Sequence, residues 1–264
     1  MGEAGAGIGR TVRAGLAGWA PAMRSCWAAL VAGAGLVLAS RLLPHGLAVL
    51  APLVAFAAIV LASGAVYRAI FAGPGGWHGL RWGREEWRLS AVFLLSSVIL
   101  AVVAAVLLVI IGAVAVGVAR SNAPGFDNGS LDAWRAALSG PAAIPASLPP
   151  LLSAILLAWL FLRLSLAPAA TIEAGGVRVL SAFGATRGVV ARLAGAGLVL
   201  TAPAAILLIL SDRARGVAGF SRVWPVLELI DVLLLFFYVI PVWTTALVDV
   251  HRRPPATTLG TLAP

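Results

Sequence analysis

The sequence predicts an all-α, polytopic membrane protein, a helical bundle of about six transmembrane helices arranged as three helical hairpins. Of its 264 residues, 61% are hydrophobic and only 11% are charged, whereas a soluble domain carries about 25% charged residues. The mean hydropathy is +1.01. Apolar runs of about 18 or more residues recur along the chain, and runs of this length are typical of transmembrane helices.

Six spans account for these runs, and each approaches or exceeds the roughly 20 residues that a bilayer requires. The third is long enough to tilt or to project beyond the membrane. The first two are joined by only three residues, so they should form a tight antiparallel hairpin. The predicted spans are 25–43, 47–70, 91–118, 148–167, 189–210 and 226–248.

The positions of the arginines predict the orientation. The sequence has no lysine, so the net charge of +9 comes from arginine alone. If the N-terminus is cytoplasmic, thirteen of the 19 arginines fall on that side and six on the other. The positive-inside rule therefore favours both termini in the cytoplasm. Because the arginines cluster at the ends of spans, we exclude nucleic acid as a partner and expect the lipid bilayer instead.

Several side chains are expected at the lipid head groups on the cytoplasmic side. Tryptophan favours the membrane interface, and arginine binds head-group phosphates. The candidates are Arg68, Arg81, Arg84, Arg88, Arg163, Arg178 and Arg187, with Trp77, Trp82 and Trp87.

Segments outside the spans are predicted to lie at the membrane surface. Residues 1–22 form a cytoplasmic or interfacial segment, residues 23–250 the membrane domain, and residues 251–264 a cytoplasmic tail. Apolar residues of the first segment share one helical face, which is typical of an interfacial helix. A short helix over 177–187 should lie along the same surface with Arg178 available to phosphate. Residues 132–138 form a further short helix in the outer loop.

The stretch GLRWGREEWRLS at 79–90 raises the question of catalysis. Intramembrane proteases that process prenylated proteins carry Glu-Glu-x-x-x-Arg, but Ser90 stands where that arginine is needed. No predicted span contains a histidine to hold a metal or a water. We therefore interpret Glu85 and Glu86 as surface residues in the first turn of a helix, paired locally with Arg84 and Arg88.

Two acids of the last span, Glu228 and Asp231, are the best candidates for function. They are three residues apart and so share a helical face. Intramembrane carboxylates often mark ion or proton paths. Alternatively they anchor the helix, because Pro225 suits its first position, the dipole favours acids there, and three upstream arginines could pair with them. Those arginines are Arg213, Arg215 and Arg222.

Prolines inside the last two spans predict distorted helices. Pro241 should kink the sixth span and Pro203 the fifth, and nearby threonines can satisfy the carbonyls that a proline leaves free. Arginines also recur near the ends of the even-numbered spans, at Arg68, Arg163 and Arg252. This spacing predicts an internal repeat of about 90 residues, or merely reflects that every even-numbered span ends inside.

Two stretches, 64–95 and 162–193, carry a family resemblance. Its motifs are Tyr67-Arg68, the Leu-Arg-Trp-Gly of 80–83 with Glu86, the Arg-Leu-Ser-Leu of 163–166, and the Thr-Arg-Gly of 186–188. They resemble bacterial inner-membrane proteins similar in layout to the membrane domain beside some glycerophosphodiester phosphodiesterases. The resemblance implies a helical membrane module without an assigned biochemical role, and not the phosphodiesterase activity.

The sequence thus leaves two functions open. The first is a non-enzymatic accessory or scaffold module that binds lipids, a membrane-protein partner or a second copy of itself. The alternative is a small-solute or proton-coupled transporter that uses Glu228 and Asp231. No residue set demands a metal or a cofactor, and no catalytic group is assigned.

Overall fold

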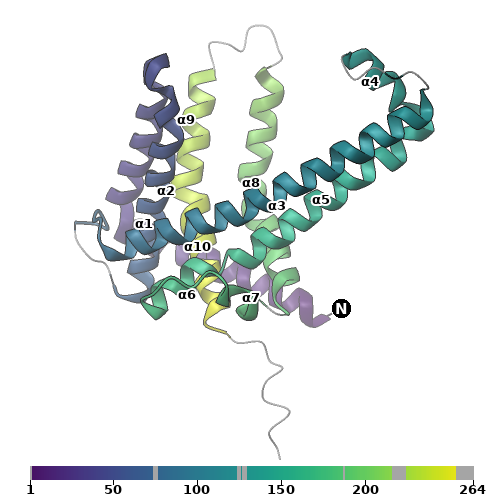
Figure 1. Cartoon of the computed structure of the whole chain (residues 1–264). Coiled ribbons are helices and arrows are strands. Elements are labelled where there is room, and N and C mark those ends of the chain that lie inside the picture. Colours follow the sequence, from purple (N-terminus) through teal and green to yellow (C-terminus); the bar gives the residue numbers. More distant parts are fainter. Residues whose placement is uncertain are drawn as a thin grey trace, which may run out of the picture. The chain divides into compact units, whose positions relative to one another are not determined.

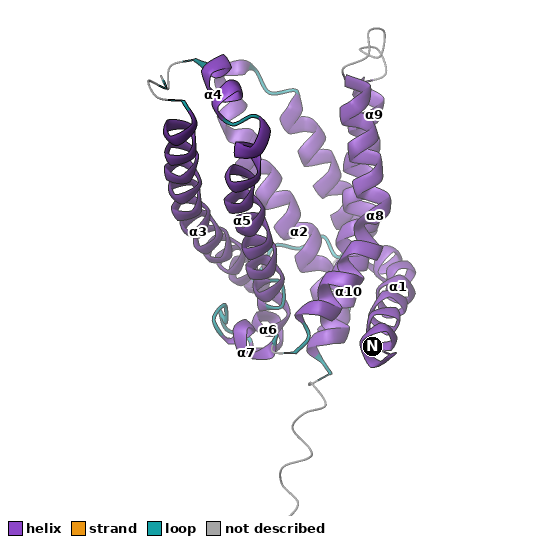
Figure 2. Cartoon of the chain, turned by 90° about the vertical axis from the view of Figure 1, so that its right-hand side faces the viewer, coloured by secondary structure: helices purple, strands orange, loops and turns teal. Residues whose placement is uncertain are grey.

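A computed structural model of the chain describes residues 2–73, 77–123, 126, 130–186, 188–215 and 224–253. The chain is 87% helical, and the described residues contain no strand beyond an isolated bridge between Trp77 and Leu80 (Figure 2). Six helices are long and apolar enough to cross a membrane. The predicted all-α polytopic class is therefore confirmed, and each predicted span overlaps one of these helices.

The elements follow one another with few long connections. In chain order they are α1 (Gly2–Arg41), the 3-10 helix η1 (His45–Leu50), α2 (Ala51–Phe71), α3 (Arg84–Asn122), α4 (Leu131–Ala137), the 3-10 helix η2 (Gly140–Ala142), α5 (Ala143–Leu164), α6 (Ala167–Ala174), α7 (Ser181–Ala185), α8 (Val190–Arg215), α9 (Trp224–Leu234), the π-helix η4 (Leu235–Val239) and α10 (Ile240–His251).

The chain forms two compact units. Unit 1 comprises residues 1–93 and 164–264, and unit 2 comprises residues 94–163. In unit 1, α1 packs against α2, α8 and α10 (Figure 1). The last span consists of α9, η4 and α10 in succession. As predicted, the first two spans form an antiparallel hairpin. Short helix α6 packs on α2 and α10.

Small residues allow the helices of unit 1 to approach closely. The ring of Phe236 is fully buried against Gly33 of α1, and Thr245 of α10 lies against Gly18 of the same helix. Ala29, Ala58 and other buried alanines fill the rest of this core. Between membrane helices, where apolar burial contributes little, such close packing supplies much of the attraction.

The last span contains a π-helix instead of a simple proline kink. Pro241 has no N–H to donate to the carbonyl of Phe237, four residues earlier. The indole N–H of Trp19 donates to that carbonyl at 2.6 Å, so α1 satisfies the group that Pro241 leaves free. The hydroxyl of Thr245 lies 3.0 Å from the carbonyl oxygen of Gly15. By contrast, α8 continues through Pro203 as an unbroken helix.

Unit 2 consists mainly of two long helices. The parts of α3 and α5 within it run side by side (Figure 2), with leucines, prolines and Ile110 lining the space between them. Short helix α4 confirms the predicted helix of the outer loop. Ser130 caps it by accepting a hydrogen bond from Ala133 N at 3.4 Å, and Phe126 packs edge-on against Trp134.

Two surface segments were predicted beside the spans. Residues 2–22 are helical and continue into the first span, because α1 runs from Gly2 to Arg41, and the position of residues 1–22 at the membrane interface stays a prediction. Helix α7 covers only 181–185, and the chain buries Val179 and Ala182 while exposing Leu180. Glycine at 175, with a φ of 64°, ends α6, and the backbone N–H of Arg178 donates to Thr171 Oγ1 at 3.0 Å. The residues expected to face the membrane surface are all exposed, and their contact with lipid stays a prediction; they are Val177, Leu180, Ser181 and Gly184.

The contact between Gly33 and Phe236 predicts a sharp difference between two glycines of α1. A Cβ at Gly33 would lie 2.5 Å from Phe236 Cε1, whereas one at Gly35 would meet nothing within 4 Å. Gly33→Ala should lower the stability by about 1–3 kcal/mol through overpacking, and Gly35→Ala should leave it unchanged or raised. Thermal unfolding in detergent measures both variants. Equal melting temperatures would show that this contact is not tight.

Candidate functional site

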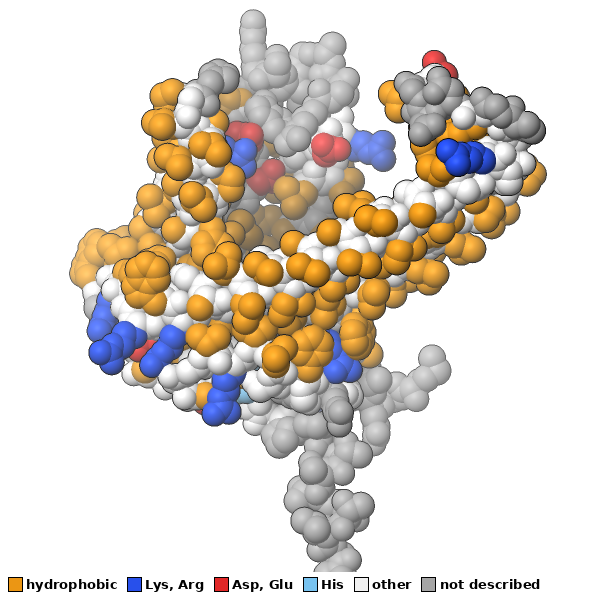
Figure 3. Space-filling model, viewed as in Figure 1, with side chains coloured by type: hydrophobic (Ala, Val, Ile, Leu, Met, Phe, Trp, Pro, Cys, Tyr) orange, Lys and Arg blue, Asp and Glu red, His pale blue; other side chains and the backbone are white. Residues whose placement is uncertain are grey.

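A cavity of about 530 Å³ opens in unit 1 among α1, α2, α8, α9 and η4. Figure 3 shows acidic and basic side chains gathered around the hollow between α9 and α8. The wall of the cavity is mostly apolar, as is usual in ligand sites, and the cavity volume falls in the range of small-molecule pockets. The lining residues are Val37, Leu38, Arg41, Ala55, Ile59, Thr201, Ala204, Ala205, Leu208, Glu228, Asp231, Val232, Leu234, Leu235 and Val239.

Three charged side chains line this cavity. Glu228 and Asp231 project from the first turns of α9 and are half-buried. Their spacing of three residues places them on the same helical face. Arg41 is the last residue of α1 and is exposed. The fold therefore brings the acids of the last span together with a base from the first.

None of these three charges is compensated within the described part of the chain. Neither acid forms a hydrogen bond or ion pair with a described residue, and Asp231 Oδ1 is a buried atom without a partner. Arg213, one of the expected partners, contacts neither acid. Arg222 and the side chain of Arg215 lie outside the described residues. Burying a carboxylate oxygen without a partner is costly, so Asp231 Oδ1 is a group in this cavity that a bound cation would stabilise.

The polar groups of the cavity can bind a ligand but form no recognisable catalytic set. Besides the charges, its wall offers the hydroxyl of Thr201, which donates to Gly197 O at 2.7 Å. The described residues contain no group of three or more His, Cys, Asp or Glu side chains placed to hold a metal ion. The wall also lacks a histidine, cysteine or lysine beside Thr201 that would activate it as a nucleophile.

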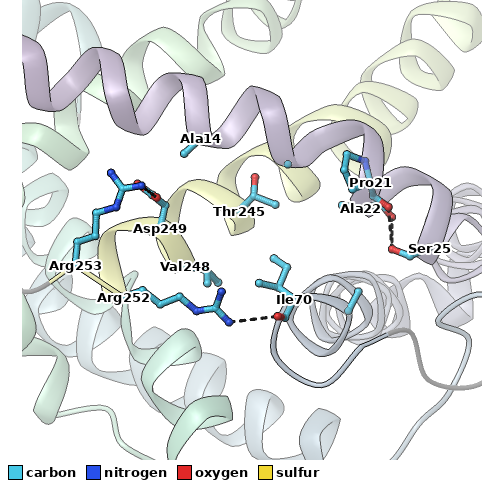
Figure 4. A pocket seen from close by; sticks show the side chains of 12 residues that line it. Ala14, Pro21, Ala22, Ser25, Ile70, Thr245, Val248, Asp249, Arg252 and Arg253 are labelled. Atoms are coloured by element: carbon cyan, nitrogen blue, oxygen red, sulfur yellow. Dashed lines mark hydrogen bonds and ion pairs between the residues drawn. The ribbon is translucent and has the colours of Figure 1, made fainter.

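A second cavity, of about 740 Å³, lies among α1, α10 and the end of α2 (Figure 4). Its charged residues are already paired. Asp249 accepts from Arg253 at 2.6 Å. The guanidinium of Arg252 donates to the carbonyl oxygen of Ile70 at 3.3 Å and lies over the ring of Phe71. The two cavities therefore adjoin different parts of the last span and differ in how their charges are compensated.

The segment that raised the question of catalysis contains a buried ion pair. Arg68 of α2 and Glu86 of α3 pair directly, and the side chain of Glu86 is completely buried. Arg68 Nη2 also donates to Gly79 O at 2.8 Å, and Gly83 N donates to Glu86 Oε2 at 2.7 Å. These contacts fix the loop between the two helices.

Two expectations about this segment are therefore wrong. Arg68 does not reach the lipid head groups, because it is only 5% exposed. Glu86 pairs with Arg68, which lies 18 residues earlier in the chain on α2, and not with Arg84 or Arg88. Local sequence spacing could not reveal this, because the partners meet only when the 77–83 loop folds back over α2.

The other candidates for head-group contact occupy varied positions. Trp77, Trp82 and Trp87 are exposed, and each packs edge-on against another indole ring. Arg81, Arg84 and Arg178 are exposed, while Arg88 is half-buried. Arg163 lies over the ring of Trp159, 4.6 Å from its centre. Arg187 lies outside the described residues. Their contact with lipid stays a prediction.

Arg41 is the member of the site that the sequence analysis did not select. A signal was present, because the predicted topology places the end of the first span and the start of the last on the same side of the membrane. Charges at these two ends are therefore expected on the same surface of the bundle. Comparisons of the chain with family models, with curated proteins and with solved structures found no match.

The buried pair predicts unequal effects for two adjacent glutamates. Glu86→Gln leaves the charge of Arg68 buried without its counter-ion, so stability should fall by about 3–5 kcal/mol. Glu85 forms no ion pair with a described residue, so Glu85→Gln should cost less than about 1 kcal/mol. Thermal unfolding of the two isosteric variants in the same detergent tests this. A Glu85 variant as unstable as the Glu86 variant would contradict the assignment.

Proposed function

We propose that this multi-pass membrane protein is a small-solute transporter of the bacterial inner membrane, with both termini in the cytoplasm. The solute, or a proton coupled to its movement, binds at Glu228 and Asp231. One observation carries this proposal: three charges that form no ion pair with any described residue line a single cavity among helices apolar enough to span a membrane. Ionisable groups in such positions are costly and often mark the paths of ions, protons or substrates.

The arrangement of the last span supports a pathway through unit 1. The cavity with Glu228 and Asp231 adjoins α9 and η4, and the second cavity, with Thr245 and Asp249, adjoins α10. The π-helix η4 lies between α9 and α10 in the chain. Its residue Phe236 packs against α1. π-Helical turns often occur at functional sites, and broken helices are a common element of transporter binding sites.

The family resemblance is consistent with a helical membrane module and implies no activity. Two of the residues on which it depends, Arg68 and Glu86, form the buried pair that fixes the loop between α2 and α3. Their position supports a role in stability. We therefore assign the solute site to the cavity, and not to the residues that carry the resemblance.

The proposed function is tested by neutralising the acids without changing their shape. Purified protein in nanodiscs is screened by thermal shift against alkali cations, polyamines and amino acids, and the solute that stabilises it most is then assayed for uptake into proteoliposomes. Asp231→Asn and Glu228→Gln should each lower solute affinity at least about tenfold, the value of one charge-assisted hydrogen bond. They should abolish uptake without unfolding the protein.

Asp132→Asn is the matched control, because Asp132 is exposed in unit 2 and its variant makes the same change in charge. This variant should bind and transport like the original protein. If no solute stabilises the protein, or if the cavity variants bind and transport as well as the control does, the transporter proposal is wrong.

A second candidate function is the accessory or scaffold module, which unit 2 favours. The most apolar 18-residue window of α3 has no residue buried within the structure. Val109 of this helix is 72% exposed. In a scaffold, a partner's spans would cover this surface, and in an isolated transporter lipid would cover it.

Photo-crosslinking in native membranes separates the two candidates. A photoreactive residue is placed at Val109 in unit 2 or at Ile206 on the exposed face of α8. A scaffold predicts one stoichiometric protein adduct at Val109 and none at Ile206. Lipid adducts alone at both positions would rule out a stable partner on α3.

A further inference from the structure

We infer that the cavity of Arg41, Glu228 and Asp231 binds a zwitterion, a molecule that carries both a primary ammonium group and an acidic group. The ammonium group binds at the two carboxylates, and the acidic group binds at the guanidinium of Arg41. This inference rests on the proposed function, because it names the class of solute that the same cavity accepts.

The charges of the cavity are what select this class. Two carboxylates and one guanidinium give −2 + 1 = −1 when all are ionised. A simple cation would satisfy the acids but leave Arg41 without a partner, and a simple anion would satisfy Arg41 but be repelled by both acids. A zwitterion supplies a partner of opposite charge to each end of the site.

The depth of each group gives the ligand a direction. Asp231 Oδ1 is a buried atom, whereas Arg41 is exposed at the end of α1. The ammonium group therefore lies deep in the cavity and the acidic group near its mouth. Arginine suits that position because its planar guanidinium binds a carboxylate or a phosphate through two parallel hydrogen bonds.

The apolar wall fits a short hydrocarbon chain between the charged groups. Val37, Ile59 and Leu208 line the cavity together with the charged residues. Burying methylene groups against such a wall is favourable, at about 0.8 kcal/mol for each. An ω-amino acid has this form, and so does the ethanolamine phosphate head group of a lipid.

A chain-matched series tests the inference on the purified full-length protein in phosphatidylglycerol nanodiscs. The ω-amino acids from 3-aminopropanoate to 6-aminohexanoate are compared by calorimetry with alkylamines and carboxylates of the same length. The best ω-amino acid should bind at least about tenfold more tightly than its matched amine, because it gains the charge-assisted bonds to Arg41.

Variants assign the two ends of the ligand. Arg41→Gln should remove the advantage of the ω-amino acid and leave the affinity for the alkylamine unchanged or higher, because a positive charge that repels the ammonium group is lost. Asp231→Asn should weaken the binding of both. Arg213→Gln is the matched control, because Arg213 lies near the end of α8 outside the cavity lining. It should behave like the original protein. Arg41 is exposed, so its variant should also fold normally, which the melting temperature without ligand verifies.

The outcomes distinguish the inference from the proposed function. Equal binding of amine and ω-amino acid, unaffected by Arg41→Gln but lost in Asp231→Asn, would overturn the zwitterion and leave the solute site in place. No binding by any member, with no response to phosphatidylethanolamine, would overturn the zwitterion, and a failure of every solute in the thermal-shift screen would overturn the solute site as well. Stabilisation by phosphatidylethanolamine nanodiscs alone, lost in Arg41→Gln, would support the same chemistry with a lipid head group as its source.

Discussion

The cost of an uncompensated charge in an apolar bundle governs the structure of unit 1. One buried pair and two partly exposed pairs among its described residues meet this constraint through a partner on another helix or on the next turn. Arg68 pairs with Glu86, and Arg253 with Asp249. His251 Nε2 lies 2.6 Å from a carboxylate oxygen of Glu173 and so connects α10 to α6. The three charges of the cavity have no such partner in the described part of the chain, and this is the basis of the functional proposal.

Close helix packing and the polar pairs depend on one another. The glycines of α1 let Phe236 and Thr245 approach its backbone, and Trp19 then reaches the carbonyl that Pro241 leaves free. The last span can thus hold a π-helix while its freed carbonyl keeps a hydrogen-bond partner. The same close approach brings the end of α1 and the start of α9 to one cavity, which Arg41 and the two acids line.

Hydropathy and spacing predicted the spans, the first hairpin and the shared face of Glu228 and Asp231, because these depend on local periodicity alone. Partners distant in sequence were not predictable in this way. Nothing in the spacing of Glu86 points to Arg68, 18 residues earlier, because the loop between them must first fold. The extent of the helix at 177–187 was mispredicted: only 181–185 are helical, and the bond from Arg178 N to Thr171 Oγ1 holds the residues before it in another conformation.

The central claim is that the charges of the cavity are compensated by a bound molecule and not by the protein itself. A cryo-electron microscopy map of the full chain in nanodiscs of native lipid, at a resolution that shows side chains, tests it most directly. The claim predicts non-protein density in contact with both Asp231 and Arg41. An empty cavity in which Arg41 or another arginine pairs directly with Glu228 and Asp231 would contradict it.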